Sequence, residues 1–138
     1  MYKLLFICAI LGCATALIGR TQSSGVRGKL LCNGSPARDV LVKLYDIDVA
    51  ADDLLAEGKT DMNGEFQLSG HTDEVTDIEP KFNIYHDCND GETACQRKFT
   101  IKIPQEYITE AKVPAKVYNA GTIELSGKFP DEARDCVH

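Results

Sequence analysis

Four cysteines behind a secretory leader restrict the fold of this chain more than any other feature. The chain has 138 residues and 6 cysteines, and two of these cysteines fall in an N-terminal segment with the pattern of a signal peptide. The mature chain keeps Cys32, Cys88, Cys95 and Cys136. An even number of cysteines in a small secreted protein indicates disulfides, here two bridges with three connectivities to choose from.

The leader itself is short. Lys3 precedes an apolar run at residues 4–16, which ends on the small pair Ala14 and Ala16. A membrane-spanning helix needs about 20 apolar residues, and no run in this chain reaches that length. We therefore expect a signal peptide over residues 1–16, with cleavage after Ala16 or as late as residue 19. Residues 17–138 then form one secreted domain without a transmembrane segment.

The segment 84–98 holds two of the four cysteines and suggests how they pair. It has the pattern of a strand, a polar turn and a second strand, so Cys88 and Cys95 are placed to close the turn. Cys32 and Cys136 are then left to tie the first strand to the C-terminal tail. A bridge closing about 100 residues contributes about 4.7 kcal/mol in the chain-entropy model, against about 3 kcal/mol for a 15-residue loop. We therefore expect the longer bridge, Cys32 to Cys136, to contribute more to the stability of the fold.

The rest of the sequence consists of short apolar strands separated by turn residues. In the cleanest alternation, at 98–103, Phe99, Ile101 and Ile103 point inward while Lys98, Thr100 and Lys102 point outward. Asn63-Gly64 predicts a hairpin turn, and residues 49–56 are expected to be a loop. About seven strands are predicted, which favours an antiparallel β-sandwich: 26–32, 40–45, 57–60, 65–69, 81–86, 98–103 and a last strand in two pieces at 117–118 and 122–125.

Several of these segments together resemble one known family. They are GVRGKLLC at 25–32, VKLYD at 42–46, TDMNGEFQL at 60–68, YHDC at 85–88 with CQR at 95–97, and GTIEL at 121–125. The combination resembles the nematode transthyretin-like family, and the cysteine-bearing block is its most specific part. The resemblance implies a secreted, transthyretin-like (prealbumin-like) all-β sandwich that is usually not an enzyme. Such families include proteins that bind cell surfaces or lipid head groups in the clearance of dying cells.

An enzymatic role finds little support in the residues. The wider transthyretin fold includes hydrolases of 5-hydroxyisourate, which use histidines, an arginine and a YRGS-like C-terminal end. This chain ends in RDCVH, and its histidines are His71, His86 and His138. His86 and Asp87 are neighbours in a strand, so their side chains point to opposite faces and are poorly placed to form a catalytic dyad. We expect no enzyme and no cofactor.

Metal binding also fits poorly. His86, Cys88 and Cys95 lie close in sequence, but they lack a C-x2-C pair and would leave two cysteines over. Asp61, Asn63 and Glu65 begin like an EF-hand loop, yet the twelfth position, residue 72, is a threonine rather than a glutamate. We therefore predict no metal site.

Charge is distributed unevenly along the chain. The whole chain carries −6, whereas residues 46–95 alone carry 14 acidic residues against Lys59 and Lys81. Residues 96–116 have an excess of basic residues, and we expect Arg97, Lys98 and Lys102 to form a basic surface for an anionic partner. The competing explanation is that acidic residues simply gather in solvated loops. A sequence pI near 5.0 and the lack of a basic stripe argue against nucleic acid.

These observations predict a secreted, non-enzymatic extracellular binding protein. Its partner would be a protein receptor, a lipid head group or a glycan at a cell surface. The alternatives are a small-molecule carrier of transthyretin type, which needs a tetramer with a central channel, and a hydroxyisourate-hydrolase-like enzyme. Asn33-Gly34-Ser35 is also a sequon for N-glycosylation, although an Asn-Gly turn explains the same residues.

Overall fold

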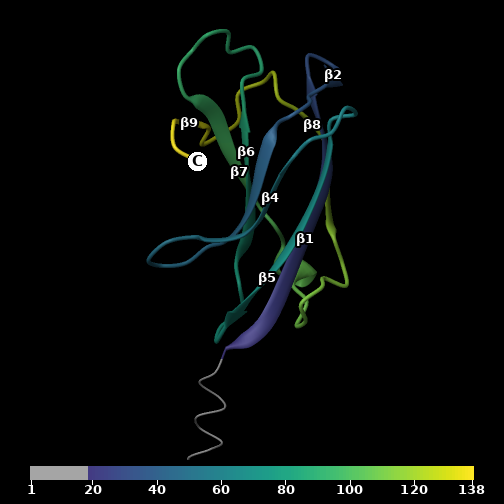
Figure 1. The fold of residues 1–138 in the computed structure, drawn as a ribbon, viewed down its shortest axis with the longest axis vertical. Helices are drawn as coiled ribbons and strands as arrows, with labels where there is room; N and C mark the ends of the chain where they lie inside the picture. Colours follow the sequence, from purple (N-terminus) through teal and green to yellow (C-terminus); the bar gives the residue numbers. More distant parts are fainter. Residues whose placement is uncertain (1–18) are drawn as a thin grey trace, which may run out of the picture.

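The computed structural model describes residues 19–138, so the expected signal peptide over residues 1–16 lies outside the described residues. The chain forms two β-sheets (Figure 1). Sheet one contains β1 (Arg20–Cys32), β2 (Ser35–Pro36), β5 (Glu65–Glu74) and β8 (Tyr118–Glu124). Sheet two contains, in spatial order, β4 (Asp53–Lys59), β3 (Leu41–Asp46), β6 (Pro80–His86), β7 (Gln96–Lys102) and β9 (Ala133–Asp135). The predicted all-β sandwich is confirmed.

Helical structure is minimal in the described part of the chain. It is confined there to one 3-10 turn, η1 (Gln105–Tyr107), which connects sheet two to sheet one. Between residues 19 and 138 there is no helix with the length and apolar character needed to cross a bilayer.

The core lies between the two sheets and follows the predicted alternation. Val42 and Leu44 of β3 are fully buried, and so are Phe82 and Ile84 of β6. Phe99 of β7 is also buried, and side chains of β1 and β5 face these residues from sheet one. Burying one such side chain contributes about 1.5–3 kcal/mol, so these inward positions hold the two sheets together.

β1 begins at residue 20, well before the predicted start at residue 26. Three of the additional residues, Gln22, Ser23 and Ser24, are polar but buried, so hydrophobic alternation did not mark this part of the strand. Gln22 shows why they are tolerated: its Nε2 donates to the carbonyls of Glu74 and Thr76, and its Oε1 accepts from the Ile78 N–H. The side chain thereby satisfies the backbone of the β5–β6 connection from inside the protein.

Two predicted connections are wrong in their details. Residues 49–56 were expected to be a loop, but β4 starts at Asp53 and pairs with Asp46 and Tyr45 of β3. The sandwich was predicted to be antiparallel, but β8 pairs with β1 in parallel. Before β8 the chain returns from sheet two along the start of β1, where Thr109 forms a bridge with Ser23, and it then runs in the same direction as β1.

The Asn63-Gly64 turn forms, but it does not make a hairpin. It carries the chain from β4 in sheet two to β5 in sheet one, and these two strands are not paired. Asp61 closes the turn by accepting from the N–H groups of Asn63 and Glu65. Gly64 has φ +76°, and a Cβ there would lie 2.4 Å from the Leu30 carbonyl oxygen, so glycine is needed for the crossing.

The disulfides connect Cys32 to Cys88 and Cys95 to Cys136, so the predicted pairing was wrong. Continuing the β6–β7 ladder beyond His86 and Arg97 would have brought Cys88 opposite Cys95. The ladder ends at that pair instead, and Asn89, Gly91 and Cys95 adopt positive φ and turn the backbone away.

Each observed bridge follows from the position of its two cysteines. Cys32 ends β1 in sheet one and Cys88 follows β6 in sheet two, so this bridge joins the sheets, with 5.7 Å between the Cα atoms. Gln96 of β7 pairs with Asp135 of β9, which places the flanking Cys95 and Cys136 4.3 Å apart at Cα. The bridges span 56 and 41 residues of sequence, so the chain-entropy model gives each a similar value of about 4 kcal/mol.

Peptide mapping of the oxidised protein without reduction should recover two linked pairs, Cys32 with Cys88 and Cys95 with Cys136. Reduced and alkylated protein is the control, in which the linked peptides disappear. Recovery of a Cys88–Cys95 peptide would contradict the structure.

Candidate functional site

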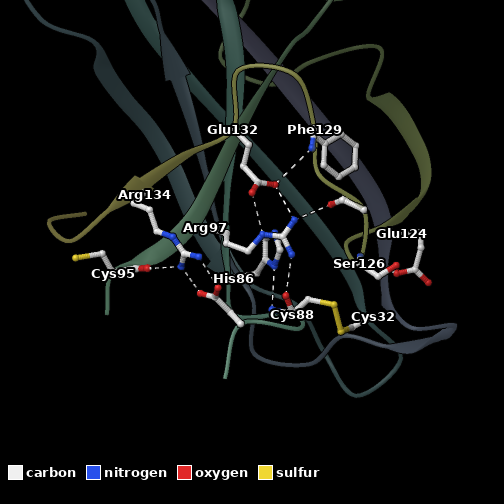
Figure 2. Close-up of polar contacts among 12 residues, drawn as sticks. Cys32, His86, Cys88, Cys95, Arg97, Glu124, Ser126, Phe129, Glu132 and Arg134 are labelled. Atoms are coloured by element: carbon white, nitrogen blue, oxygen red, sulfur yellow. Dashed lines mark hydrogen bonds and ion pairs between the residues drawn. A yellow bond between two sulfur atoms is a disulfide. The ribbon is translucent and has the colours of Figure 1, made fainter. Parts of the chain in front are cut away.

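Arg97 was expected on a basic surface, but it is buried between the sheets. The side chain retains 9% exposure, and its guanidinium is fully engaged (Figure 2). One terminal nitrogen donates to the Cys88 carbonyl at 2.7 Å, and the other donates to the Gly127 carbonyl at 2.6 Å. Nε and a terminal nitrogen also donate to the two oxygens of Glu132, at 2.9 and 2.8 Å. Arg97 therefore has a structural role and is withdrawn as a ligand-binding residue.

The alternation of β7 explains this burial. Arg97 occupies the same inward series as Phe99 and Ile101, one step before the segment in which the pattern was recognised. Its charge suggested a surface position, yet its place in the strand dictates an inward one. The buried charge is tolerated because Glu132 pairs with it in a bidentate geometry and holds only 8% side-chain exposure itself. The guanidinium lowers the pKa of Glu132 through this hydrogen bond.

A second arginine fastens the same end of the molecule. Arg134 of β9 donates to both oxygens of Asp90 and to the Cys95 carbonyl (Figure 2). The hydrogen bond from Arg134 lowers the pKa of Asp90. Together with Arg97 and the two disulfides it holds the β6–β7 loop in place, so these contacts have a structural role.

His86 lies beside Arg97 and has no arrangement for catalysis. The ring is 2% exposed, packs edge-on against Phe99, and accepts the Cys88 N–H at Nδ1 over 3.1 Å. Nε2 is buried without a hydrogen-bond partner. Burial lowers the pKa of His86 to about 4, and the nearby Arg97 charge adds to this effect. Asp87 is exposed and accepts from Gln96 instead.

Lys98 and Lys102 do point outward, as predicted, and three further lysines share their side of sheet two. Lys98 lies 3.4 Å from Asp135, whereas Lys102 is exposed. Cross-strand pairing relates Lys102 to Lys81 on the next strand. We call this surface the lysine face: Lys43 of β3, Lys59 of β4, Lys81 of β6, and Lys98 and Lys102 of β7.

The lysine face also contains two tyrosines that orient its ammonium groups. Lys43 Nζ lies 5.8 Å from the ring centroid of Tyr85, and Lys81 Nζ lies 5.8 Å from that of Tyr45. Lys81 is additionally paired with Asp52. For Lys43, Lys59 and Lys102, the described chain places no carboxylate within ion-pair distance. The outward alternation of residues 41–45 was the signal for Lys43, but strand pairing was needed to bring these lysines together.

Asn33 lies at the tip of a two-residue hairpin between β1 and β2, with φ 53°. Its side-chain amide exchanges hydrogen bonds with Asn89 beside the Cys32–Cys88 bridge. Glu124 of β8 accepts from the backbone N–H groups of this turn and of Ser126, and these bonds lower its pKa to about 2. The sequon is therefore exposed and held in a defined turn.

Acidic residues gather at one place that the sequence did not indicate. Carboxylate oxygens of Asp46, Asp53 and Glu74 lie within 4.8 Å of one another. Burial is the main cause that raises the pKa values of Asp46 and Glu74, and the neighbouring carboxylates raise them further. At Asp46 a hydrogen bond from the Glu79 backbone N–H opposes this effect. Asp61, which was considered above as part of an EF-hand-like loop, accepts hydrogen bonds at Oδ1 from the backbone N–H groups of its own turn. Its role is to close that turn.

Comparisons with known proteins identify the family of this fold. The model of the Transthyretin-like family matches residues 27–104. Transthyretin-like protein 5 of Caenorhabditis elegans is 61% identical over 138 residues, covering 99% of each chain. This chain belongs to the nematode transthyretin-like family.

Other family members from the same organism are similar over most of their length. Transthyretin-like protein 33 is 50% identical over 120 residues, covering 86% of this chain and 84% of its own. Transthyretin-like protein 2 is 47% identical over 128 residues, covering 88% and 86%. The resemblance recognised in the cysteine-bearing segments is therefore confirmed for nearly the whole chain.

Replacing Arg97 should destabilise the transthyretin-like domain strongly. Arg97→Met leaves Glu132 buried without its partner, and breaking such a pair costs about 3–5 kcal/mol. Urea unfolding of the oxidised protein would measure the change. The double variant Arg97→Met, Glu132→Leu should recover much of the loss, and a single variant as stable as the parent would contradict the structural role.

Stability should also depend on pH through His86. Because the folded-state pKa is lowered to about 4 from the ordinary 6.5, protonation opposes folding, and stability is lost as pH falls from about 6.5 toward 4. His86→Gln keeps an acceptor for the Cys88 N–H but does not titrate. Its free energy of unfolding should vary less than that of the parent between about pH 7 and pH 5. Parallel pH profiles for the two proteins would exclude His86 as the source.

Proposed function

We propose that the mature protein is a secreted, non-enzymatic binding protein whose lysine face recognises an anionic component of a cell surface. The leader pattern at residues 1–16 and the two disulfides support secretion. Membership of the transthyretin-like family supports an extracellular binding role.

The observation that carries the proposal is the concentration of cations on one side of a strongly acidic chain. The whole chain carries −6, yet four strands contribute five lysines to the outer side of sheet two. Within residues 19–138, carboxylates form ion pairs with only two of them, Lys81 and Lys98. Lys43, Lys59 and Lys102 are left to meet an external anion on this side of the sheet.

The surroundings of His86, the histidine considered above for catalysis, support a binding protein over an enzyme. His86 is enclosed in the core, and its arginine neighbour is saturated by Glu132 and two backbone carbonyls. General acid-base catalysis needs a titratable group within hydrogen-bond reach of a substrate. His86 is buried out of such reach.

The anion that we propose for the lysine face is the head group of an acidic lipid. Each basic residue near an anionic membrane contributes about 1 kcal/mol. A face of several lysines is thus sufficient to hold the protein at such a surface even though its net charge is negative. The attraction should weaken as salt rises, because exposed charges are screened.

Lysine neutralisation should therefore weaken vesicle binding. Lys98→Gln with Lys102→Gln removes the contribution of about 1 kcal/mol from the unpaired Lys102 and a smaller one from Lys98, which is paired with Asp135, so affinity should fall at least about fivefold. Co-sedimentation with vesicles of phosphatidylserine and phosphatidylcholine, compared with phosphatidylcholine alone, would measure it.

The matched control is Lys112→Gln with Lys116→Gln, which removes the same charge from exposed positions between η1 and β8. This double variant should bind as the parent does. Equal losses in the two double variants would show that only total charge matters, and binding by neither variant nor parent would overturn the head-group proposal.

A further inference from the structure

A separate groove lies on the outer side of sheet one, across the three strands β5, β1 and β8. Its volume is about 520 Å³, and most of its lining residues are polar, with Phe66 and two glycines also among them. Arg27 and Lys29 stand on the central strand β1, while β5 contributes Glu65 and Gln67 and β8 contributes Asn119 and Thr122. The groove faces away from the lysine face, because that face belongs to the other sheet.

The floor of the groove is made by a β-bulge. Three steps of β8, from Asn119 to Thr122, span two steps of β1, from Arg27 to Lys29. Gly121 in the bulge has φ +75°, and a Cβ built there would point into open space within the groove. On the neighbouring strand, a Cβ at Gly28 would lie 2.9 Å from the Phe66 ring and 3.2 Å from the Gly121 carbonyl oxygen, so glycine is needed there for close packing. Bulges of this kind are frequent beside functional sites.

The charged groups of the groove are spaced apart rather than paired. Within residues 19–138, neither Arg27 nor Lys29 lies within ion-pair distance of a carboxylate. Arg27 is exposed, and its cross-strand neighbours are the amides Gln67 and Asn119. Two residues along the strand, Lys29 has Glu65 on one side and Thr122 on the other.

This arrangement defines what a ligand must offer. Arg27 can only donate, so its end of the groove fits an acceptor such as a carboxylate. Glu65 at the other end can only accept, so it fits a hydroxyl donor, and the amides and Thr122 fit either. The two ends are about 7 Å apart along the strand, which one sugar ring with its substituents spans. A multiply charged phosphate is disfavoured because Glu65 and Asp61, which also lines the groove, repel it more strongly than they repel a single carboxylate.

We propose that this groove binds a uronic acid unit of an acidic glycan, with the carboxylate on Arg27 and the ring hydroxyls on Glu65, Asn119 and Thr122. This site is independent of the lysine face and of the function proposed for it. The occupant is a sugar acid rather than a membrane, because the groove is recessed and carries both charge signs.

The test is a titration of the oxidised mature protein with digalacturonic acid in an isothermal titration calorimeter, which measures the affinity. Arg27→Gln removes the charged donor and should weaken binding about tenfold or more. Gly121→Asn should block the floor, because asparagine tolerates positive φ better than other side chains and fills the open space. The neutral disaccharide digalactose should bind more weakly than the acid.

Two variants control for charge and for backbone strain. Arg38→Gln removes an exposed arginine outside the groove. Gly91→Asn places the same side chain at another glycine of positive φ, 56°, which also has open space around it. Both should bind digalacturonic acid as the parent does, and so should Lys98→Gln with Lys102→Gln.

Three results would overturn the proposal. They are the absence of saturable binding by the parent, equal affinity for the acidic and neutral disaccharides, and binding unchanged by Arg27→Gln and Gly121→Asn. Loss of vesicle binding in the lysine variants, with glycan binding intact, would separate this site from the lysine face.

Discussion

The buried guanidinium of Arg97 joins parts of the chain that no strand pairing connects. It reaches the β6–β7 loop through the Cys88 carbonyl, and the β8–β9 connection through Gly127 and Glu132. The Cys32–Cys88 bridge ties the same loop to sheet one. One end of the sandwich is thus closed by a charge pair and a disulfide working on the same backbone, while the middle is closed by apolar packing. A small secreted domain with a modest core gains much of its cohesion from such local fastening.

The outer sides of the two sheets carry most of their polar and charged side chains. Alternation along each strand sends apolar side chains to the core and polar ones outward, so each sheet presents its own chemistry. Sheet two presents lysines supported by tyrosines, and sheet one presents a polar groove with separated charges. Because the sheets face opposite ways, the two surfaces can act independently.

How far the sequence predicted this structure depended on the range of the interactions involved. Alternation in 40–45 and 98–103 was read correctly because it is a local property of a strand. The extension of β1 to Arg20 was missed, since its buried residues are polar and Gln22 is stabilised by distant backbone groups. Cysteine pairing was predicted wrongly because it rested on a ladder continuing past His86, whereas positive φ at Asn89 and Cys95 ends it. Of the expected basic surface, Lys98 and Lys102 face outward, but Arg97 belongs to the core.

The sequence by itself determined the fold class, the family and the four cysteines that form disulfides, because periodicity, turn residues and motifs are written in consecutive positions. Only the tertiary structure decided which cysteines meet, which arginine is buried, and which lysines share a surface. These properties depend on strand register and on contacts between residues far apart in the chain. The groove at Gly121 illustrates the difference: its glycine is visible in the sequence, but the bulge that makes it a floor exists only where β8 pairs with β1.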